Sequence, residues 1–372
     1  MLLASQFDLL VEPITALFQE FEESVIRDIA RRLAGLDYAA PTAAWQVQRL
    51  SESGMLYERI LQELSRVTGR SQRELRRMFR KAGVKAMAFD DAIYLAAGLS
   101  PAPLNLSPAM GEVLAAGLRK TGGVMRNLTM TTALSGQMAF ESAADLAYMQ
   151  ISSGAFSYQT AIRQAVKRVA ADGLEVIHFA KRTDRLDVAM RRTVLTGVSQ
   201  TVGELTMARA EEMGADLVQT SAHIGARNKG EGPANHESWQ GQVYSRTGNG
   251  YPDFVTVTGY GTGEGLHGWN CRHSFFPFFE GISQAAYDQA TLDNYAAKTV
   301  TYNGQEISVY EATQQQRAIE RKIRHWKRQA SALEAAGLDH DQETAKIKEW
   351  QARMRDFIGQ TGLQRQRVRE QV

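Results

Sequence analysis

Residues 7–33 read FDLLVEPITALFQEFEESVIRDIARRL, and this stretch sets the expected class of the fold. Its apolar residues recur every three or four positions, which is the spacing of one face of an α-helix. The positions that keep this spacing are Phe7, Leu10, Ile14, Leu17, Phe21, Val25, Ile29 and Leu33. The stretch therefore predicts one long amphipathic helix that buries a single face.

The same helical pattern continues outward from this stretch, up to about residue 173. Pro41 marks the start of a second helix, which is expected to end near Gly69. Ser71 and Glu74 match a capping box, in which both side chains satisfy exposed amide groups of a first helical turn, so a third helix is expected to begin at Ser71. Prolines between residues 100 and 108 predict a linker, because proline removes an amide donor. Further helices are expected over 109–130, 135–151, 157–171 and 184–213.

The second half of the chain mixes short strands with irregular segments. β-Branched and aromatic residues predict strands over 174–179, ending at Phe179, and over 217–219. Asn303 and Gly304 favour the positive backbone angles of a two-residue hairpin turn. Apolar residues spaced by three and four after residue 316 predict an antiparallel helical hairpin that is interrupted at Gly337.

These patterns together predict a mainly helical α+β protein in three parts. Residues 1–100 form an N-terminal multi-helix region suited to docking on other proteins. Residues 101–282 form a central domain, helical at first and then a small irregular α+β part with glycine-rich loops, and residues 283–372 form a β-hairpin followed by a basic helical hairpin. A chain of 372 residues exceeds the usual size of one hydrophobic core, so more than one domain is expected.

The composition excludes several classes of protein. The chain has 43 Lys and Arg against 41 Asp and Glu, a balance that argues against a protein coated with nucleic acid over its whole surface. Cys271 is the only cysteine, so an intrachain disulfide is impossible and a reducing compartment is expected. The sequence contains no run of about 18 apolar residues, and its first 23 residues lack the basic start of a signal peptide. We therefore expect neither a membrane-spanning helix nor a targeting segment.

Three motifs lie in the glycine-rich part of the chain. Residues 236–241 read HESWQG, residues 259–273 read GYGTGEGLHGWNCRH, and residues 275–278 read FFPF. This ordered set resembles the phage minor capsid protein 2 family and, more distantly, the Mu F-like head morphogenesis proteins, in which a second cysteine usually stands at the position of His273. The motif residues are Arg227, His236, Trp239, Gly241, Gly268, Asn270, Cys271, Arg272 and His273.

The resemblance implies a structural protein of a tailed bacteriophage and not an enzyme. It implies a minor capsid protein of the virion, placed inside the head near the portal vertex, assembled in the cytoplasm of the host bacterium and acting in head morphogenesis and DNA packaging or delivery. The implied partners are the portal protein and other head proteins, with double-stranded DNA as a further partner for local basic patches, and no membrane. A DNA-binding packaging or ejection protein and a metal-dependent nuclease-like enzyme are the alternatives.

The motif residues also suit a metal site. Cys271 and His273 lie two positions apart, so an extended backbone presents both side chains on one face. With His236 they offer three donors of the kinds that zinc prefers, and His223 or His267 is available as a fourth. Packing with ordinary hydrogen bonds is the alternative, since a buried cysteine often acts only as a small apolar residue. Catalysis by His236, Asn270 and His273, the residue types of His-Asn-His nucleases, or by Cys271 as a nucleophile, is a further alternative.

Glycines at every second or third position between residues 259 and 268 predict a tight loop that brings His236 near Cys271. Positive charge gathers elsewhere, on one face of the helix expected after residue 71 and in the C-terminal tail. Such charge suits phosphate groups or an acidic portal surface, with a solvated helix face as the alternative. The candidate contact residues are Arg66, Arg70, Arg73, Arg77 and Lys81 in the first cluster and Arg321, Arg324 and Arg328 in the second.

Overall fold

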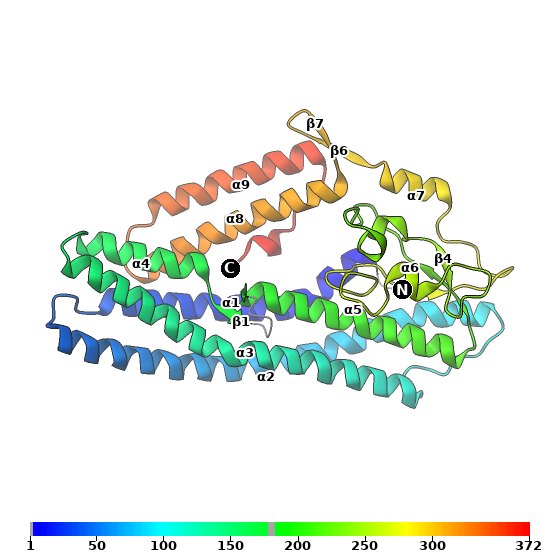
Figure 1. Ribbon diagram of the computed structural model, residues 1–372, viewed down its shortest axis with the longest axis horizontal. Coiled ribbons are helices and arrows are strands. Elements are labelled where there is room, and N and C mark those ends of the chain that lie inside the picture. The colour runs from blue at the N-terminus through cyan, green and yellow to red at the C-terminus, as the bar shows by residue number, and fades with distance from the viewer. Residues whose placement is uncertain (1–2, 178–182) are drawn as a thin grey trace. The chain divides into compact units, whose positions relative to one another are not determined.

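The computed structural model describes residues 3–177 and 183–372 and confirms the mainly helical α+β class (Figure 1). The helix predicted from residues 7–33 is present as α1, and the linker predicted near residue 100 separates two long helices. The first five helices are α1 (Ala4–Gly35), α2 (Thr42–Ala96), α3 (Pro108–Ser152), α4 (Tyr158–Asp172) and α5 (Leu186–Glu212). Among the described residues, no helix is both long and apolar enough to cross a lipid bilayer.

Two helix boundaries expected from the sequence are wrong. The helix α2 runs through Ser71 without a break, and the Ser71 hydroxyl donates to the Thr68 carbonyl at 3.0 Å. A serine in a helix interior can bond to a carbonyl of the preceding turn, so the capping pattern alone does not require a helix start. The segments 109–130 and 135–151 likewise form the single helix α3, where Gly136 serves packing, since a Cβ there would lie 2.7 Å from Ile60.

The chain divides into two compact units, each assembled from three separate stretches. The first unit contains residues 1–13, 72–123 and 191–314, and the second contains 14–71, 124–190 and 315–372. Several long helices therefore contribute to both units. The predicted boundaries near residues 100 and 282 do not separate the units, and the division of the chain into three functional parts remains a prediction.

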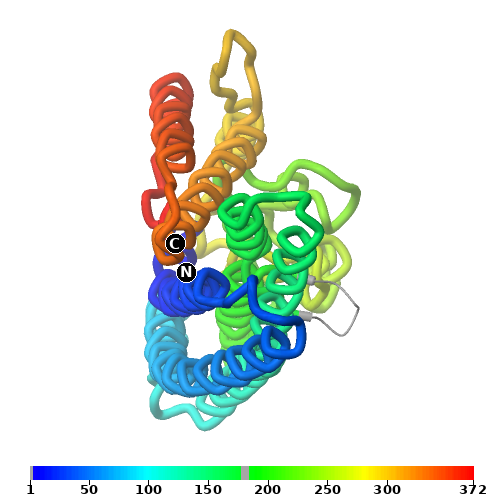
Figure 2. The backbone as a smooth tube through the Cα atoms, turned by 90° about the vertical axis from the view of Figure 1, so that its left-hand side faces the viewer, coloured from blue at the N-terminus to red at the C-terminus, as the bar shows by residue number. Residues whose placement is uncertain are grey.

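The described residues of the second unit are helical apart from loops and one small antiparallel pair of strands, β1 (Glu175–Ile177) and β2 (Thr183–Arg185). Phe179, expected to end the first strand, lies outside the described residues. The predicted helical hairpin is confirmed as α8 (Val309–Ala335) and α9 (Asp341–Thr361), which run side by side in Figures 1 and 2. The short helix η3 (Arg367–Glu370) follows them. Buried Glu343 joins α9 to α4 through ion pairs with Arg163 at 2.6 Å and Lys167 at 2.7 Å.

The first unit contains the irregular α+β part. Its central strand β3 (Leu217–Thr220) pairs antiparallel with β4 (Val243–Ser245) and with β5 (Phe275–Pro277). The loops between these strands carry three short helices, η1 (Gly232–Ala234), η2 (His236–Ser238) and α6 (Phe254–Thr258), and α7 (Gln289–Ala296) follows β5. The predicted hairpin is confirmed as β6 (Thr299–Tyr302) and β7 (Gln305–Ser308), with positive φ angles at Asn303 and Gly304. A core of Val218, Trp239, Tyr244, Phe254, Leu266, Cys271 and Phe275 lies beneath the sheet and its loops.

Candidate metal centre

His236 is held by a turn that the buried Trp239 anchors. It begins the helix η2, and the amide of the following Glu237 donates to the Arg227 carbonyl at 3.0 Å. The indole of Trp239 is fully buried and donates to the Pro233 carbonyl at 3.0 Å. Hydrogen bonds thus fix both ends of the turn, and His236 is only 3% exposed.

Cys271 and His273 are placed by the glycine-rich loop before β5. Two parts of the loop pack backbone against backbone. A Cβ atom at Gly265 would lie 2.3 Å from the carbonyl oxygen of Gly259, and a Cβ atom at Gly268 would lie 2.4 Å from the carbonyl oxygen of Gly263. Only glycine fits such backbone contacts. The chain then leaves the loop as an extended segment, and Cys271 and His273 are both about 1% exposed.

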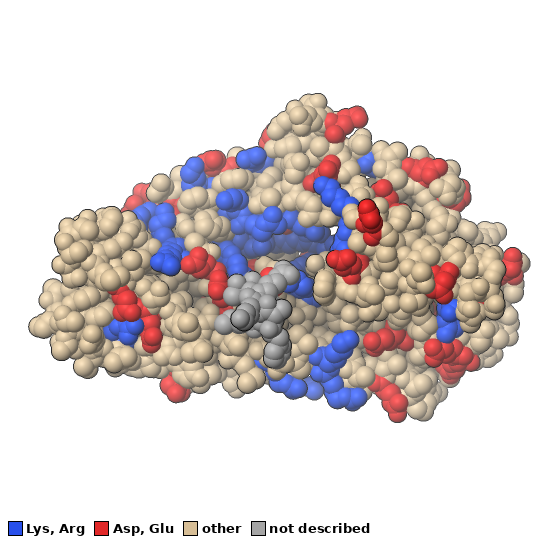
Figure 3. Space-filling model, viewed as in Figure 1, with Lys and Arg blue, Asp and Glu red and all other residues tan. Residues whose placement is uncertain are grey.

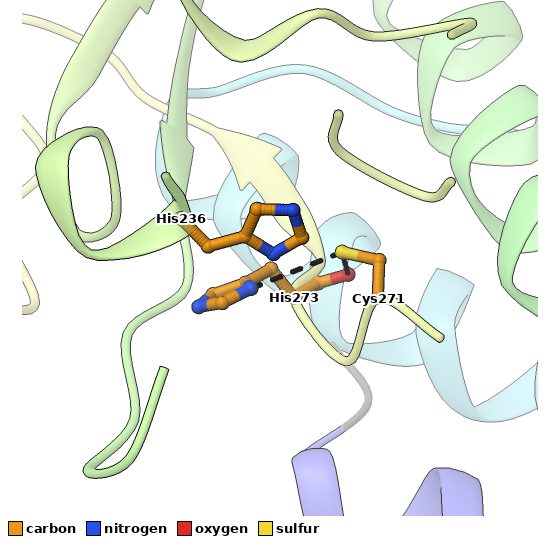
Figure 4. A group of neighbouring side chains, drawn as sticks. All are labelled: His236, Cys271 and His273. Atoms are coloured by element: carbon orange, nitrogen blue, oxygen red, sulfur yellow. Dashed lines mark hydrogen bonds between the residues drawn. The ribbon is translucent and has the colours of Figure 1, made fainter. Parts of the chain in front are cut away.

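The structure brings the three predicted donors together. The ligand atoms of His236, Cys271 and His273 all lie within 4.8 Å of one another, and all three residues are buried. The Cys271 Sγ is 3.8 Å from the His273 Nδ1, and Figure 4 shows both imidazole rings turned toward the sulfur. The three side chains are therefore placed so that one ion can contact all of them.

The partners of the two rings define which nitrogen carries the proton. One atom of the Gln240 side-chain amide lies 3.0 Å from the backbone N–H of His223. Because a backbone N–H can only donate, this atom must be the amide oxygen. The same oxygen is 3.1 Å from the His273 Nε2, which must therefore be the donor. The His236 Nε2 is 2.8 Å from the Glu264 carbonyl and is a donor for the same reason. Neutral rings held in this way leave both Nδ1 lone pairs unprotonated.

Burial keeps these donors uncharged near neutral pH. It lowers the pKa of His236 to about 4, because a charged imidazolium is poorly solvated inside the fold. Burial also lowers the pKa of His273 well below its ordinary value, and the neighbouring histidines add to this effect. The pKa of the Cys271 thiol is raised by burial. The site therefore contains two neutral imidazoles and a protonated thiol at pH 7.

The two histidines considered as a fourth ligand occupy other positions. The ring of His223 stacks on that of His273 with centroids 4.4 Å apart, and its Nδ1 donates to the Ile224 carbonyl at 3.1 Å. His267 bonds to the Ser199 hydroxyl at 2.8 Å through its Nδ1, and its Nε2 is buried with no hydrogen-bond partner among the described residues. Neither belongs to the group of three converging donors.

The remaining motif residues support the loops. Arg227 donates to the Trp269 carbonyl at 3.0 Å, and Arg272 forms an ion pair at 3.0 Å with Asp8 of α1. Gly241 has a φ of 74°, a backbone conformation that suits glycine. Asn270 is exposed, so its side chain lies outside the buried group, which differs from the arrangement expected of a His-Asn-His nuclease. Gln240 was missed by sequence reasoning, because an amide within a motif shows no distinguishing pattern.

Comparison with known proteins identifies the family of the chain. The model of the family described as phage minor capsid protein 2 matches residues 2–359, which include every motif residue. The chain belongs to the phage minor capsid protein 2 family. It is 23% identical over 367 residues to a structural protein of Lactococcus phage LL-H, a match that covers 93% of each chain. It is also 31% identical over 129 residues to a structural protein of Lactococcus phage mv4, covering 32% of this chain and 94% of that protein. No solved structure matches the chain.

The basic residues predicted on this minor capsid protein fall into two groups. Arg66, Arg70, Arg73, Arg77 and Lys81 are all exposed on α2, and Figure 3 shows Lys and Arg side chains over α2 and α3. In the tail, Arg321 is exposed on α8. Arg328 is only 3% exposed and Arg324 donates to the Arg369 carbonyl inside the second unit. Tertiary packing thus engages both groups internally, and a contact of Arg324 or Arg328 with nucleic acid or a partner stays a prediction.

A groove in the first unit adds three cations that the sequence analysis had not selected, namely Arg76, Arg80 and Lys85. Each is exposed on α2, and no ion pair between described residues involves any of them. They line the groove together with Arg77 and Lys81. Its apolar lining comes from both helices and consists of Phe79, Val84, Ala88, Leu114 and Leu118.

Proposed function

We propose that this minor capsid protein is bound near the portal vertex inside the phage head and acts in head morphogenesis and in the packaging or delivery of DNA. The observation that carries the proposal is the family match over residues 2–359, which makes the whole chain a capsid component. A capsid component acts through contacts with other subunits. The α2–α3 groove is the surface we assign to that contact.

The groove has the chemistry to bind an acidic amphipathic helix of the portal or of a neighbouring head protein. Its five cations are exposed and form no ion pair within the described residues, so a partner's carboxylates need not compete with internal acids. Its apolar side chains, among them the half-exposed Val84, offer area to the partner's apolar face. Both features lie on rigid helices.

Co-purification with the portal protein of the same phage tests this proposal. The wild-type protein should form a stable complex, and the variant Arg77→Glu/Arg80→Glu should lose it, because two attractive charges become repulsive. The matched control is Lys348→Glu/Arg355→Glu, which reverses two exposed charges on α9 and should bind as the wild type does. Equal binding by all three proteins would contradict the assigned surface.

DNA binding is the second candidate function, favoured by the exposed cations along α2. Each phosphate contact that is lost should reduce the slope of log affinity against log salt concentration by about 0.9. The variant Leu118→Ser separates the two candidates, since a helical partner uses the apolar lining of the groove whereas DNA uses the cations alone. If Leu118→Ser weakens portal binding, the partner of the groove is a protein. If Leu118→Ser leaves the portal complex unchanged and Arg77→Glu/Arg80→Glu weakens DNA binding, the groove binds DNA.

A further inference from the structure

We propose that His236, Cys271 and His273 bind one zinc ion, which fastens the η2 turn and the glycine-rich loop to the start of β5. The site is independent of the proposed role in the phage head. It is formed within the first unit, by residues that are distant in sequence and meet beneath a sheet of only three short strands.

The distances suit a tetrahedral ion. Zinc bonds of about 2.3 Å to sulfur and about 2.0–2.1 Å to nitrogen place neighbouring donors about 3.3–3.6 Å apart. The Cys271 Sγ and the His273 Nδ1 are already 3.8 Å apart. The widest separation in the group is at most 4.8 Å, so closing the site needs small rotations of the side chains (Figure 4).

The donor set selects the ion. A thiolate and two imidazoles are borderline or soft ligands that suit zinc, whereas Mg²⁺ and Ca²⁺ require oxygen ligands. The groups behind the ligands are also in place, because the Glu264 carbonyl and the Gln240 amide oxygen each hold the Nε2 proton of one ring. Such outer hydrogen bonds fix the tautomer and the orientation of metal-binding histidines. Here they direct both Nδ1 lone pairs to the shared position.

Three protein donors leave one tetrahedral position, which we assign to water. His223 does not fill it, since its ring lies flat against that of His273 and its ligand atoms are not part of the converging group. Binding forms one sulfur–zinc and two nitrogen–zinc bonds. The thiol of Cys271 releases one proton to solvent, and nothing is oxidised or reduced.

Zinc titration of the full-length protein tests the proposal. Protein freed of metal by a chelator should take up one zinc ion per chain, measured by mass spectrometry of the metal after removal of excess ion. Cobalt(II), added in place of zinc, should give a thiolate charge-transfer band in the near ultraviolet. Zinc should also raise the melting temperature of the wild-type protein.

Variants identify the ligands. Cys271→Ser and His236→Gln should lose the bound zinc, the cobalt band or both, and their melting temperatures should no longer respond to zinc. His223→Gln, a histidine change beside the site, should bind one equivalent as the wild type does. Circular dichroism establishes that each variant is folded before it is titrated. A folded wild-type protein that retains no zinc overturns the site, and loss of zinc by His223→Gln overturns the assignment of water as the fourth ligand.

Discussion

Two buried polar clusters, one in each unit of this protein, are built in different ways. In the first unit, the buried group of His236, Cys271 and His273 contains uncharged side chains whose ligand atoms converge, with the Cys271 thiol 3.8 Å from the His273 Nδ1. In the second unit, a cluster combines the carboxylates of Glu22 and Asp187 with three guanidinium groups, so opposite charges face one another within the fold. The residues of this cluster are Glu22, Arg185, Asp187, Arg324 and Arg328. The second cluster already contains its own cations, whereas the first presents uncharged donors that one metal cation can contact.

The largest effect is expected from breaking the charged cluster. Glu22 is 3% exposed, accepts the Leu174 amide at 2.9 Å and lies 3.6 Å from the Arg185 guanidinium. The variant Glu22→Gln removes one of the two carboxylates that face three guanidinium groups, so the free energy of unfolding should fall by about 3–5 kcal/mol. Denaturant unfolding measures this change. The control Glu20→Gln removes an exposed carboxylate of the same helix and should change stability by no more than about 0.5 kcal/mol.

The second largest effect is expected from acid, which should destabilise the first unit through His267. Burial lowers the pKa of His267 to about 3, from an ordinary value near 6.5 in the unfolded chain. Below pH 6.5 His267 binds a proton in the unfolded chain but stays neutral in the folded protein. Its contribution to stability is therefore complete above this pH and is lost progressively toward pH 3. Well inside this window each pH unit should cost about 1.4 kcal/mol, and the loss between pH 6.5 and 4.5 should be about 2 kcal/mol.

The variant His267→Asn should remove this part of the pH dependence. Asparagine tolerates the positive φ of 60° at this position better than most residues. The readout is the difference in unfolding free energy between pH 7 and pH 4.5, which is separate from any loss at pH 7 caused by the smaller side chain. His340→Gln, at the start of α9, is the control and should keep the wild-type dependence. An unchanged dependence in His267→Asn would show that other groups cause the acid sensitivity.

A smaller effect is expected at the residue that orients the neutral donors. Gln240→Leu keeps much of the side-chain volume but removes the acceptor shared by the His223 amide and the His273 Nε2. Without metal the unfolding free energy should fall by about 1–3 kcal/mol, the cost of unsatisfied buried donors. Zinc affinity should fall by about 10–100-fold, since an outer hydrogen bond is lost. Gln242→Leu changes an exposed glutamine nearby and should alter neither quantity.

The smallest effect on stability is expected at the α2 groove. Arg77→Gln and Arg80→Gln each replace an exposed cation that has no ion pair among the described residues. Each variant should change the unfolding free energy by less than about 0.5 kcal/mol. A clear loss of portal or DNA binding at unchanged stability would mark this surface as one used for contacts. A large loss of stability would instead show that these cations serve the fold.

The sequence predicted those features that depend on neighbouring residues along the chain. The apolar spacing of residues 7–33 predicted α1, since the period of a helix is local. Asn303 and Gly304 predicted the hairpin turn for the same reason. The Cys-x-His spacing predicted two donors on one face, and the surrounding glycines predicted a loop tight enough to bring His236 to them. The motif as a whole predicted the family.

Only the tertiary structure decided features that depend on what a segment packs against. Ser71 lies inside α2 and not at its start, because the buried face of the helix continues on both sides of it and its hydroxyl has a carbonyl partner in the preceding turn. Arg321 and Arg328 follow one another within two turns of α8, yet one is exposed and the other is enclosed with the Glu22 cluster. Gln240 acts on His273 across 33 positions of sequence. Local patterns determine helices, turns and donor types, whereas burial and the partner of each polar atom are set by distant segments that no local pattern specifies.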